Sequence, residues 1–170
     1  DEVLNGNSSK TIKIIRSTVP SRAEGFLPGG PSEKHKVYER PYQQIYDDLF
    51  GRGDGYNILK LKGLVDFEST SYLRGCTMND TIIIVDEMQN MTFQELDTVM
   101  TRVGDNSKII FCGDFRQTDL EQRDRVGLLN FINITKRMRK FSYIEFEKDD
   151  IVRSGLVRDY IIQRTELGFA

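Results

Sequence analysis

The stretch IIIVDEMQN sets two acids, Asp86 and Glu87, directly after four aliphatic residues. A buried strand seldom ends on two negative charges without a reason. A carboxylate at the tip of a strand can hold Mg²⁺, mostly through water, because Mg²⁺ keeps much of its hydration shell. A second carboxylate one residue further on can orient and polarise an attacking water. The plainer alternative is that the two acids only end a strand and begin a loop.

A second polar cluster follows another apolar run, KIIFCGD (108–114). Gly113 and Asp114 end this run, and Gln117 comes three residues later. In a parallel α/β sheet, ligands bind beyond the carboxyl ends of the strands. Two neighbouring strands would therefore deliver both clusters to one edge. Hydrolysis of a nucleoside triphosphate requires acidic side chains, a divalent cation and a neutral amide close together, and this edge would supply such a site.

The elements that must position these residues alternate along the chain. Strand patterns occupy residues 11–16, 64–69, 81–86, 108–114 and 141–147, and helical patterns occupy residues 31–50, 56–63, 92–104, 127–138 and 154–165. Pro41 predicts two shorter segments in place of one helix over 31–50. Thr92 and Glu95 have the spacing of a capping box, so a helix is expected to begin at Thr92 and to end at Gly104.

The strand and helix order predicts the fold class. Residues 81–86 and 108–114 are apolar without alternation, which is typical of strands covered on both faces. Such strands alternating with amphipathic helices indicate an α/β fold with a mostly parallel sheet flanked by helices. We expect residues 1–10 to be a mobile leader and residues 11–170 to form one domain.

Composition narrows the class of protein. The 170 residues are 38% hydrophobic and 29% charged, which allows a buried core. The net charge of -2, from 24 basic and 26 acidic residues, gives no whole-molecule case for nucleic-acid binding. No apolar run approaches the roughly 18 residues of a membrane span, and the acidic, polar start is no signal peptide. With Cys76 and Cys112 expected to be reduced thiols, we predict a protein of the cytoplasm.

Residues 82–120 closely resemble the PhoH-like proteins, which are P-loop ATPases with motifs similar to those of superfamily 1 helicases. Three other segments agree with that family in order: IIRSTVPSRAEGFLPGG (14–30), YLRGCTMND (72–80) and EFEKDDIVRSGLVRDYI (145–161). The motif spacing is most similar to the phage branch, which implies the host cytoplasm as location. The resemblance implies a RecA-like P-loop NTPase core that binds ATP and Mg²⁺.

The resemblance also implies a role for each matched position in the two clusters. Asp86 would be the Walker B carboxylate for Mg²⁺, and Glu87 the catalytic base or water-orienting acid. Gln89 would lie near the nucleotide, whereas Met88 replaces the family's commoner small residue. The GDxxQ element that senses the γ-phosphate would consist of Gly113, Asp114 and Gln117.

Four arginines are further candidates. Arg153 would stabilise phosphate charge, in its own subunit or across an interface. Arg16 lies in the segment that touches single-stranded nucleic acid in related helicases. Arg74 could contact nucleic acid, a neighbouring subunit or a local acid, and Arg102 could cap a helix dipole or act as an arginine finger. We expect the protein to form a homo-oligomer, for which a ring is one arrangement.

The phosphate cradle of such a site, G-x-x-x-x-G-K-[ST], does not occur in the 170 residues. Residues 6–11 (GNSSKT) come nearest, but Ser9 stands where the second glycine belongs and a strand pattern follows. In the family the cradle lies upstream of the part resembled here. We therefore expect the carboxy-terminal portion of a longer ATPase, incomplete at its N-terminal end, inactive alone and with an exposed sheet edge that promotes self-association.

Three functions stay open at this point. The first is an ATPase module coupled to RNA or single-stranded DNA. The second is a non-catalytic binding or assembly module with a degenerate nucleotide site. The third is a metal-dependent nuclease using Asp86, Glu87 and Asp114, which leaves the segment GDFRQ unexplained.

Two surface patterns also have two interpretations each. The basic run Lys136, Arg137, Arg139 and Lys140 either complements a helix dipole on a solvated face or contacts a nucleic-acid backbone. Three tyrosines at four-residue spacing, Tyr38, Tyr42 and Tyr46, indicate a packing stripe, with base stacking as the lesser option.

Overall fold

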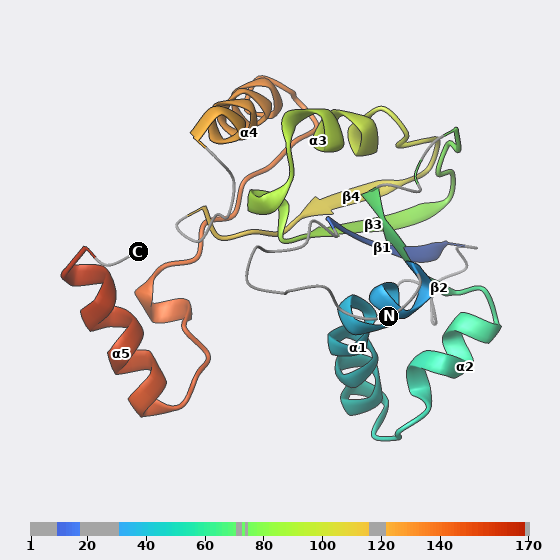
Figure 1. The fold of residues 1–170 in the computed structure, drawn as a ribbon, viewed down its shortest axis with the longest axis horizontal. Coiled ribbons are helices and arrows are strands. Elements are labelled where there is room, and N and C mark those ends of the chain that lie inside the picture. Colours follow the sequence, from blue (N-terminus) through green and yellow to red (C-terminus); the bar gives the residue numbers. More distant parts are fainter. Residues whose placement is uncertain (1–9, 18–30, 71–72, 74, 116–121, 169–170) are drawn as a thin grey trace.

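The structure is a computed structural model and describes residues 10–17, 31–70, 73, 75–115 and 122–168 (Figure 1). In chain order the elements are β1 (Thr11–Arg16), α1 (Pro31–Phe50), α2 (Gly55–Leu61), β2 (Val65–Ser69), β3 (Thr81–Asp86), the 3₁₀ turn η2 (Met88–Asn90), α3 (Phe93–Met100), β4 (Lys108–Phe111), α4 (Gln122–Thr135), the 3₁₀ turn η3 (Lys148–Asp150) and α5 (Gly155–Glu166). No helix in the described ranges has both the length and the apolar character needed to cross a bilayer.

The four strands form one sheet in the order β2-β1-β3-β4. Each neighbouring pair is parallel, so all carboxyl ends point to the same edge. Arg16 pairs with Asp86 in the β1–β3 register, and Val85 pairs with Phe111 in the β3–β4 register. The predicted α/β class with a parallel sheet is confirmed.

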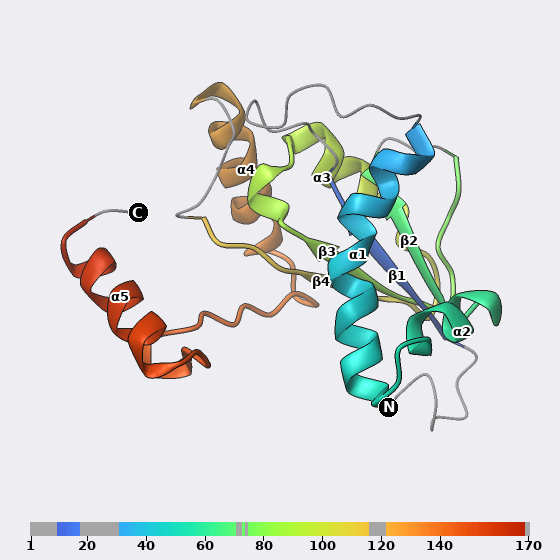
Figure 2. The same cartoon turned by 60° about the horizontal axis from the view of Figure 1, so that its bottom comes forward.

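Helices cover both faces of the sheet (Figures 1 and 2). Successive side chains of a strand point to opposite faces. On one face Ile15, Ile83 and Val85 pack in a core with α3 and α4. On the other face Ile14 and Phe67 pack in a second core with α1 and α2. This double burial explains why the sequence of β3 is an unbroken apolar run.

Helix α1 is continuous across Pro41, and the predicted division into two segments is wrong. Proline removes one backbone donor and crowds the preceding turn, which usually breaks a helix. Here Pro41 is exposed, while Tyr42 is buried in the core and Tyr38 and Tyr46 pack at its margin. The three tyrosines anchor the turns on both sides of the proline to the same sheet face. Tertiary packing therefore outweighs the local defect, and the packing interpretation of the tyrosine stripe is confirmed.

The predicted strand over residues 141–147 does not form. A strand needs a neighbour to satisfy its backbone groups, and no described strand pairs with this segment. Apolar and polar side chains alternate along this segment, but two of its apolar side chains are not packed in a core. Ile144 and Phe146 are 82% and 77% exposed. The segment runs from α4 to α5, which stands apart from the sheet and buries no residue (Figures 1 and 2).

Three elements have bounds that differ from the predicted ones by three residues or more. Strand β4 ends at Phe111, and Cys112 continues its ladder with one amide donated to the carbonyl of Val85. Helix α3 ends at Met100, not at Gly104, whose amide instead donates to the carbonyl of Met78. Helix α4 runs over Gln122–Thr135, shifted towards the N-terminus from the predicted 127–138.

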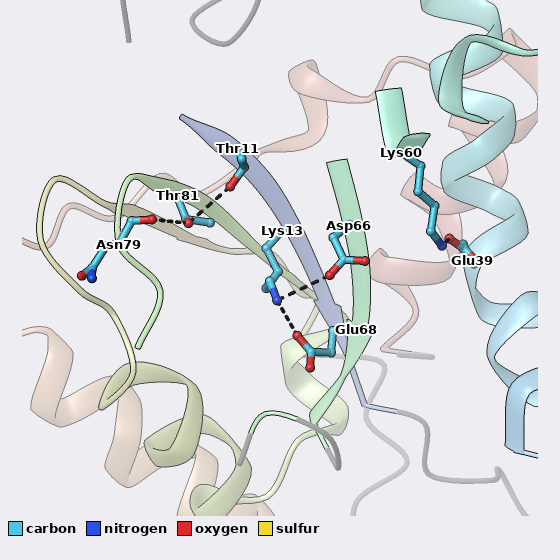
Figure 3. Close-up of polar contacts among 8 residues, drawn as sticks. All are labelled: Thr11, Lys13, Glu39, Lys60, Asp66, Glu68, Asn79 and Thr81. Carbon is cyan, nitrogen blue, oxygen red and sulfur yellow. Dashed lines mark hydrogen bonds and ion pairs between the residues drawn. The ribbon is translucent and has the colours of Figure 1, made fainter. Parts of the chain in front are cut away.

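Polar pairs tie the edge elements together (Figure 3). Lys13 on β1 lies 2.6 Å from Glu68 and 3.5 Å from Asp66, both on β2. Burial alone would lower the pKa of Lys13, but the two carboxylates together raise it. Between α1 and α2, the buried Glu39 accepts hydrogen bonds from Lys60 and, at 2.7 Å, from the Tyr56 hydroxyl. These contacts fix β2 and α2 against the elements that carry the site.

We predict that Glu39→Ala lowers the free energy of unfolding by roughly 1–3 kcal/mol, because it leaves a buried tyrosine hydroxyl without its acceptor. Urea unfolding followed by circular dichroism measures the change. The control is Glu166→Ala, which removes an exposed pair with Lys148 and should change stability by less than about 1 kcal/mol. Equal losses in the two variants would contradict a structural role for Glu39.

Candidate functional site

The carboxyl ends of β1, β3 and β4 bring most of the predicted site residues together. Asp86 is the last residue of β3 and lies beside Arg16, the last residue of β1. Both belong to the set of side chains that faces α1, because Ile15 and Val85, one position earlier, face α3. Cys112, directly after β4, is close enough for the charge of Asp86 to add to burial in raising the pKa of its thiol.

Asp86 accepts a hydrogen bond from α1. The Tyr42 hydroxyl donates to Oδ2 of Asp86 at 2.6 Å, and its ring lies 5.5 Å from that of Phe67. Burial raises the pKa of Tyr42, the hydrogen bond and charge of Asp86 raise it further, and Arg16 opposes them. The hydroxyl therefore keeps its proton and acts as a fixed donor to the carboxylate.

Glu87 adopts an unusual backbone conformation, with φ 53° and ψ 39°. This left-handed region is disfavoured for residues other than glycine, and such conformations gather at functional sites. The turn redirects the chain after β3 into η2. Arg16 offsets part of the negative charge of Glu87, since its Nη2 lies 3.8 Å from Oε1 of that residue. The guanidinium of Arg16 also lies 5.7 Å from the ring centre of Tyr38.

The buried amide of Gln89 links the ends of β3 and β4. Its Nε2 donates to Oε2 of Glu87, and its Oε1 accepts from the backbone N–H of Asp114 at 3.2 Å. The amide of Met88 also donates to the carbonyl of Cys112 at 3.0 Å. The two polar clusters predicted from the sequence are thus joined by hydrogen bonds.

Gly113 is required by this close approach. A Cβ atom at position 113 would lie 2.6 Å from Oε1 of Gln89 and 2.8 Å from Cγ of Met88. Contacts this short force neighbouring atoms to move. Glycine therefore lets the segment after β4 lie directly against η2.

Glu95 fastens the beginning of α3 to this edge. The predicted capping box is confirmed, with Thr92 Oγ1 accepting from the amide of Glu95 and Glu95 Oε2 accepting from the amide of Thr92 at 2.9 Å. The other oxygen, Oε1, accepts from Ser17 at 3.1 Å and from Thr70 at 2.6 Å. The sequence indicated the capping box but not these partners, which follow β1 and β2. The sequence indicates these partners only by placing a hydroxyl residue, Ser17 or Thr70, directly after each strand.

The donors present suit a magnesium ion that is held largely by phosphate and water. Mg²⁺ in nucleotide sites binds one or two carboxylates and keeps several waters. Asp86 offers a carboxylate whose Oδ2 is occupied by Tyr42, and the next residue, Glu87, is linked through Gln89 to the backbone of Asp114. In the described part of the chain, no three His, Cys, Asp or Glu side chains gather into a metal cage. The carboxylates present therefore suit a Mg²⁺ ion that phosphate and water would also hold.

Two other predicted residues that the structure describes, Arg102 and Arg153, do not join this network. Arg102 lies at the end of α3, where its Nη1 donates to the carbonyl of Thr98 and its backbone carbonyl accepts from Met78, before β3 begins. It is therefore at the opposite end of the sheet from Asp86. Arg153 is exposed just before α5, away from the sheet. Gln117 and Arg74 lie outside the described residues.

A groove of about 420 Å³ lies between the first turn of α3 and the second half of α4. Its lining consists of Phe93, Asn130, Asn133, Ile134 and Arg137. Gly127 permits the close approach of the two helices, because a Cβ there would lie 2.9 Å from Cβ of Phe93. The groove combines an aromatic surface, two amides and a cation, and it adjoins the basic run that follows α4.

The family of PhoH-like proteins matches residues 2–164 of the chain. The chain belongs to the PhoH-like family. The resemblance noted for the motifs at Asp86 and Gly113 is therefore confirmed at the family level. The parallel sheet, with both motifs at one edge, is consistent with an α/β core of that family.

Bacterial relatives agree with this assignment. The PhoH-like protein of Mycobacterium leprae (strain TN) is 37% identical over 166 residues, which cover 94% of this chain and 47% of that protein. The PhoH-like protein of Bacillus subtilis (strain 168) is 34% identical over 157 residues, covering 92% of this chain and 49% of that protein. Protein PhoH of Escherichia coli (strain K12) is 35% identical over 136 residues, which cover 78% of this chain and 38% of that protein. The chain spans about half the length of the curated PhoH-like relatives it matches.

We predict that Gly113→Ala displaces the Gln89 amide and lowers the free energy of unfolding by roughly 1–3 kcal/mol. Hydrogen exchange measures the local effect, since the N–H of Asp114 should lose protection when its acceptor moves. The matched control is Gly53→Ala, where an added Cβ meets nothing within 4 Å. Unchanged protection at Asp114 in the Gly113 variant would show that the two motifs are not linked in this way.

Proposed function

We propose that this chain is an ATP-binding and ATP-hydrolysing module of the PhoH-like type. The observation that carries the proposal is the hydrogen-bonded junction between the two motifs, in which Gln89 connects Glu87 to the backbone of Asp114. A site that holds an acid, an amide and a glycine at the carboxyl ends of adjacent parallel strands is suited to a nucleoside triphosphate.

The residues divide the work by position. Asp86, with Oδ2 held by Tyr42, presents its remaining oxygen to the metal or to a metal-bound water. Glu87 accepts a proton from, or orients, the attacking water, and Gln89 holds Glu87 in place. Mg²⁺, when bound, neutralises charge on the phosphates. Gln117, in the family's GDxxQ pattern, would add a neutral amide near the γ-phosphate.

The phosphate cradle must come from residues outside the motifs found here. In the described sheet β4 pairs with β3 on one side and with no strand on the other. That open edge lies next to Gly113 and can accept a further parallel strand. We propose that an upstream segment supplies both this strand and the phosphate-binding loop, and that the 170 residues alone hydrolyse ATP negligibly.

Coupling to RNA or single-stranded DNA is the second part of the proposal. Electrostatic contacts with phosphates and stacking on aromatic rings are the two interactions such ligands use. The groove on α3 and α4 offers Phe93 for stacking, two asparagines for base edges, and Arg137 beside three further cations at positions 136, 139 and 140. Phe93 begins α3, six residues after Glu87. A ligand bound there would therefore contact the helix that follows Asp86 and Glu87.

Assembly and origin stay predictions from the sequence. A homo-oligomer or ring would allow Arg153 or Arg102 to reach a neighbour's nucleotide, which suits their distance from Asp86 in this chain. The phage-type assignment rests on motif spacing, and the cytoplasmic location on composition. The alternative function is a non-catalytic binding module, which is favoured by one observation. Arg16 contacts Glu87 and Tyr42 contacts Asp86, so both acids already have partners within the protein.

Glu87→Gln in the full-length protein is predicted to lower the turnover number for ATP by about 10²–10⁴-fold, because the amide cannot accept the proton of water. ATP affinity should be retained. Asp86→Asn should instead raise the Mg²⁺ concentration needed for half-maximal rate. Phosphate release under saturating ATP, with Mg²⁺ titrated, measures both effects.

The control is Asp97→Asn, which neutralises an exposed acid on α3 outside the site and should leave both quantities unchanged. Full activity of the Glu87 variant would overturn the assignment of this residue. If the wild-type full-length protein neither binds nor hydrolyses ATP, the non-catalytic alternative replaces the enzyme proposal.

Phe93→Ala and Arg137→Ala are predicted to weaken binding of a labelled single-stranded RNA or DNA. Loss of a stacked ring removes about 1–3 kcal/mol. Loss of one phosphate contact reduces the slope of log affinity against log salt by about 1. Fluorescence anisotropy at several salt concentrations measures both. Lys62→Ala, which removes an exposed cation directly after α2 across the sheet, is the control. Equal affinities for all four proteins would exclude this groove as the nucleic-acid site.

A further inference from the structure

We propose that Tyr42 is a positioning residue for the metal carboxylate Asp86, which makes helix α1 a functional part of the nucleotide site. This inference rests on the proposed function, because the metal belongs to the nucleotide complex. The direct observation is the 2.6 Å hydrogen bond from the Tyr42 hydroxyl to Oδ2 of Asp86. The sequence places these two residues 44 positions apart, and no motif connects them.

The tyrosine ring is held rigidly from several sides. Tyr42 is 9% exposed and lies in the core formed with Ile14, Val65 and Phe67. The turns of α1 before and after Pro41 both pack on this face, so the helix does not hinge at the proline. A ring fixed by packing delivers its hydroxyl to one place, which a flexible donor could not do.

The carboxylate it contacts is fixed from the other side by the sheet. Asp86 ends β3 in register with Arg16 of β1, and both side chains face α1. The Tyr42 bond occupies Oδ2 and sets the plane of the carboxylate. The other oxygen, Oδ1, is thereby directed for a cation or for water on a cation. Without the hydroxyl the carboxylate could rotate about its side-chain bonds, and the metal would bind a less ordered ligand.

The same helix also reaches Glu87 through Arg16. The guanidinium lies 5.7 Å from the ring centre of Tyr38 and 3.8 Å from Glu87. Tyr38 and Tyr42 are one helical turn apart and so present their rings to the same end of the sheet. One face of α1 therefore orders the surroundings of both acids, with the direct contact made by Tyr42.

A matched control exists in the same core. The Tyr56 hydroxyl also donates to a carboxylate, at 2.7 Å to Glu39, and this pair is at the contact of α1 with α2. Tyr42→Phe and Tyr56→Phe remove the same chemical group from the same type of bond. Only the first should alter metal binding. Tyr46→Phe, one turn further along α1, removes a hydroxyl from a ring packed edge-on against Tyr56 and serves as a second control.

The test measures Mn²⁺ binding to the full-length protein with a non-hydrolysable ATP analogue, by loss of the free Mn²⁺ signal in electron paramagnetic resonance. Tyr42→Phe should weaken Mn²⁺ binding by about 10–100-fold, the range found when an outer hydrogen bond to a metal ligand is removed. Binding of the analogue without metal should be unchanged. Tyr56→Phe and Tyr46→Phe should bind Mn²⁺ as the wild type does, even where they unfold more easily.

The outcomes separate this inference from the proposed function. If Asp86→Asn loses Mn²⁺ affinity while Tyr42→Phe retains it, Tyr42 has no positioning role and the nucleotide site stands. If Asp86→Asn also retains wild-type affinity, the proposed site itself is wrong, and the role of Tyr42 falls with it. A loss in all three tyrosine variants would mark a general effect of weakened packing and would likewise overturn a specific role.

A second measurement avoids dependence on the folding of Tyr42→Phe. 3-Fluorotyrosine placed at position 42 keeps the hydroxyl and reports its surroundings by ¹⁹F resonance. Addition of Mg²⁺ with the ATP analogue should shift this resonance, because the charge on Asp86 is then shared with the cation. The same label at Tyr56 should not shift. A silent resonance at position 42, in protein that binds the analogue with Mg²⁺, would overturn the inference.

Discussion

The buried amide of Gln89 makes the candidate site a single unit. It donates to Glu87 after β3 and accepts from the backbone of Asp114 after β4, so neither strand end can shift without breaking a hydrogen bond. Leaving a buried polar group unpaired costs more than the bond itself contributes, which makes such a link firm. The glycine at 113 is a consequence, since any side chain there would collide with the amide. The left-handed turn at Glu87 serves the same link, since it leads the chain from β3 into η2, which carries Gln89.

Helices on both faces of the sheet contact the residues around this link. Helix α3 is fastened to the ends of β1 and β2 through Glu95, whose two oxygens serve the capping box and the hydroxyls of Ser17 and Thr70. Helix α1 approaches from the other face and contacts Asp86 through Tyr42. A change at the nucleotide site could therefore reach both faces of the protein through short hydrogen bonds. The proposed coupling of ATP hydrolysis to a ligand bound elsewhere would use these connections.

The limits of the sequence predictions follow from what each pattern encodes. The helix over 31–50 was expected to divide at Pro41, because local rules register only the lost donor and the steric clash. Three tyrosines packed on one sheet face outweighed that defect. The alternation over 141–147 was expected to form a strand, but alternation describes side chains and not the neighbour that must pair with the backbone. In both cases the deciding contact came from a distant part of the chain.

The sequence by itself determined the fold class, the family, the capping box at Thr92 and the two motifs containing Asp86, Glu87, Gln89, Gly113 and Asp114. These depend on residue type and on short spacings, which a linear chain displays directly. Only the tertiary structure decided that Arg16 lies beside Glu87, that Tyr42 holds Asp86, and that Arg102 is at the far end of the sheet. Such contacts join residues tens of positions apart. They follow from strand register and from the face on which each helix packs, and neither of these is encoded in any local pattern.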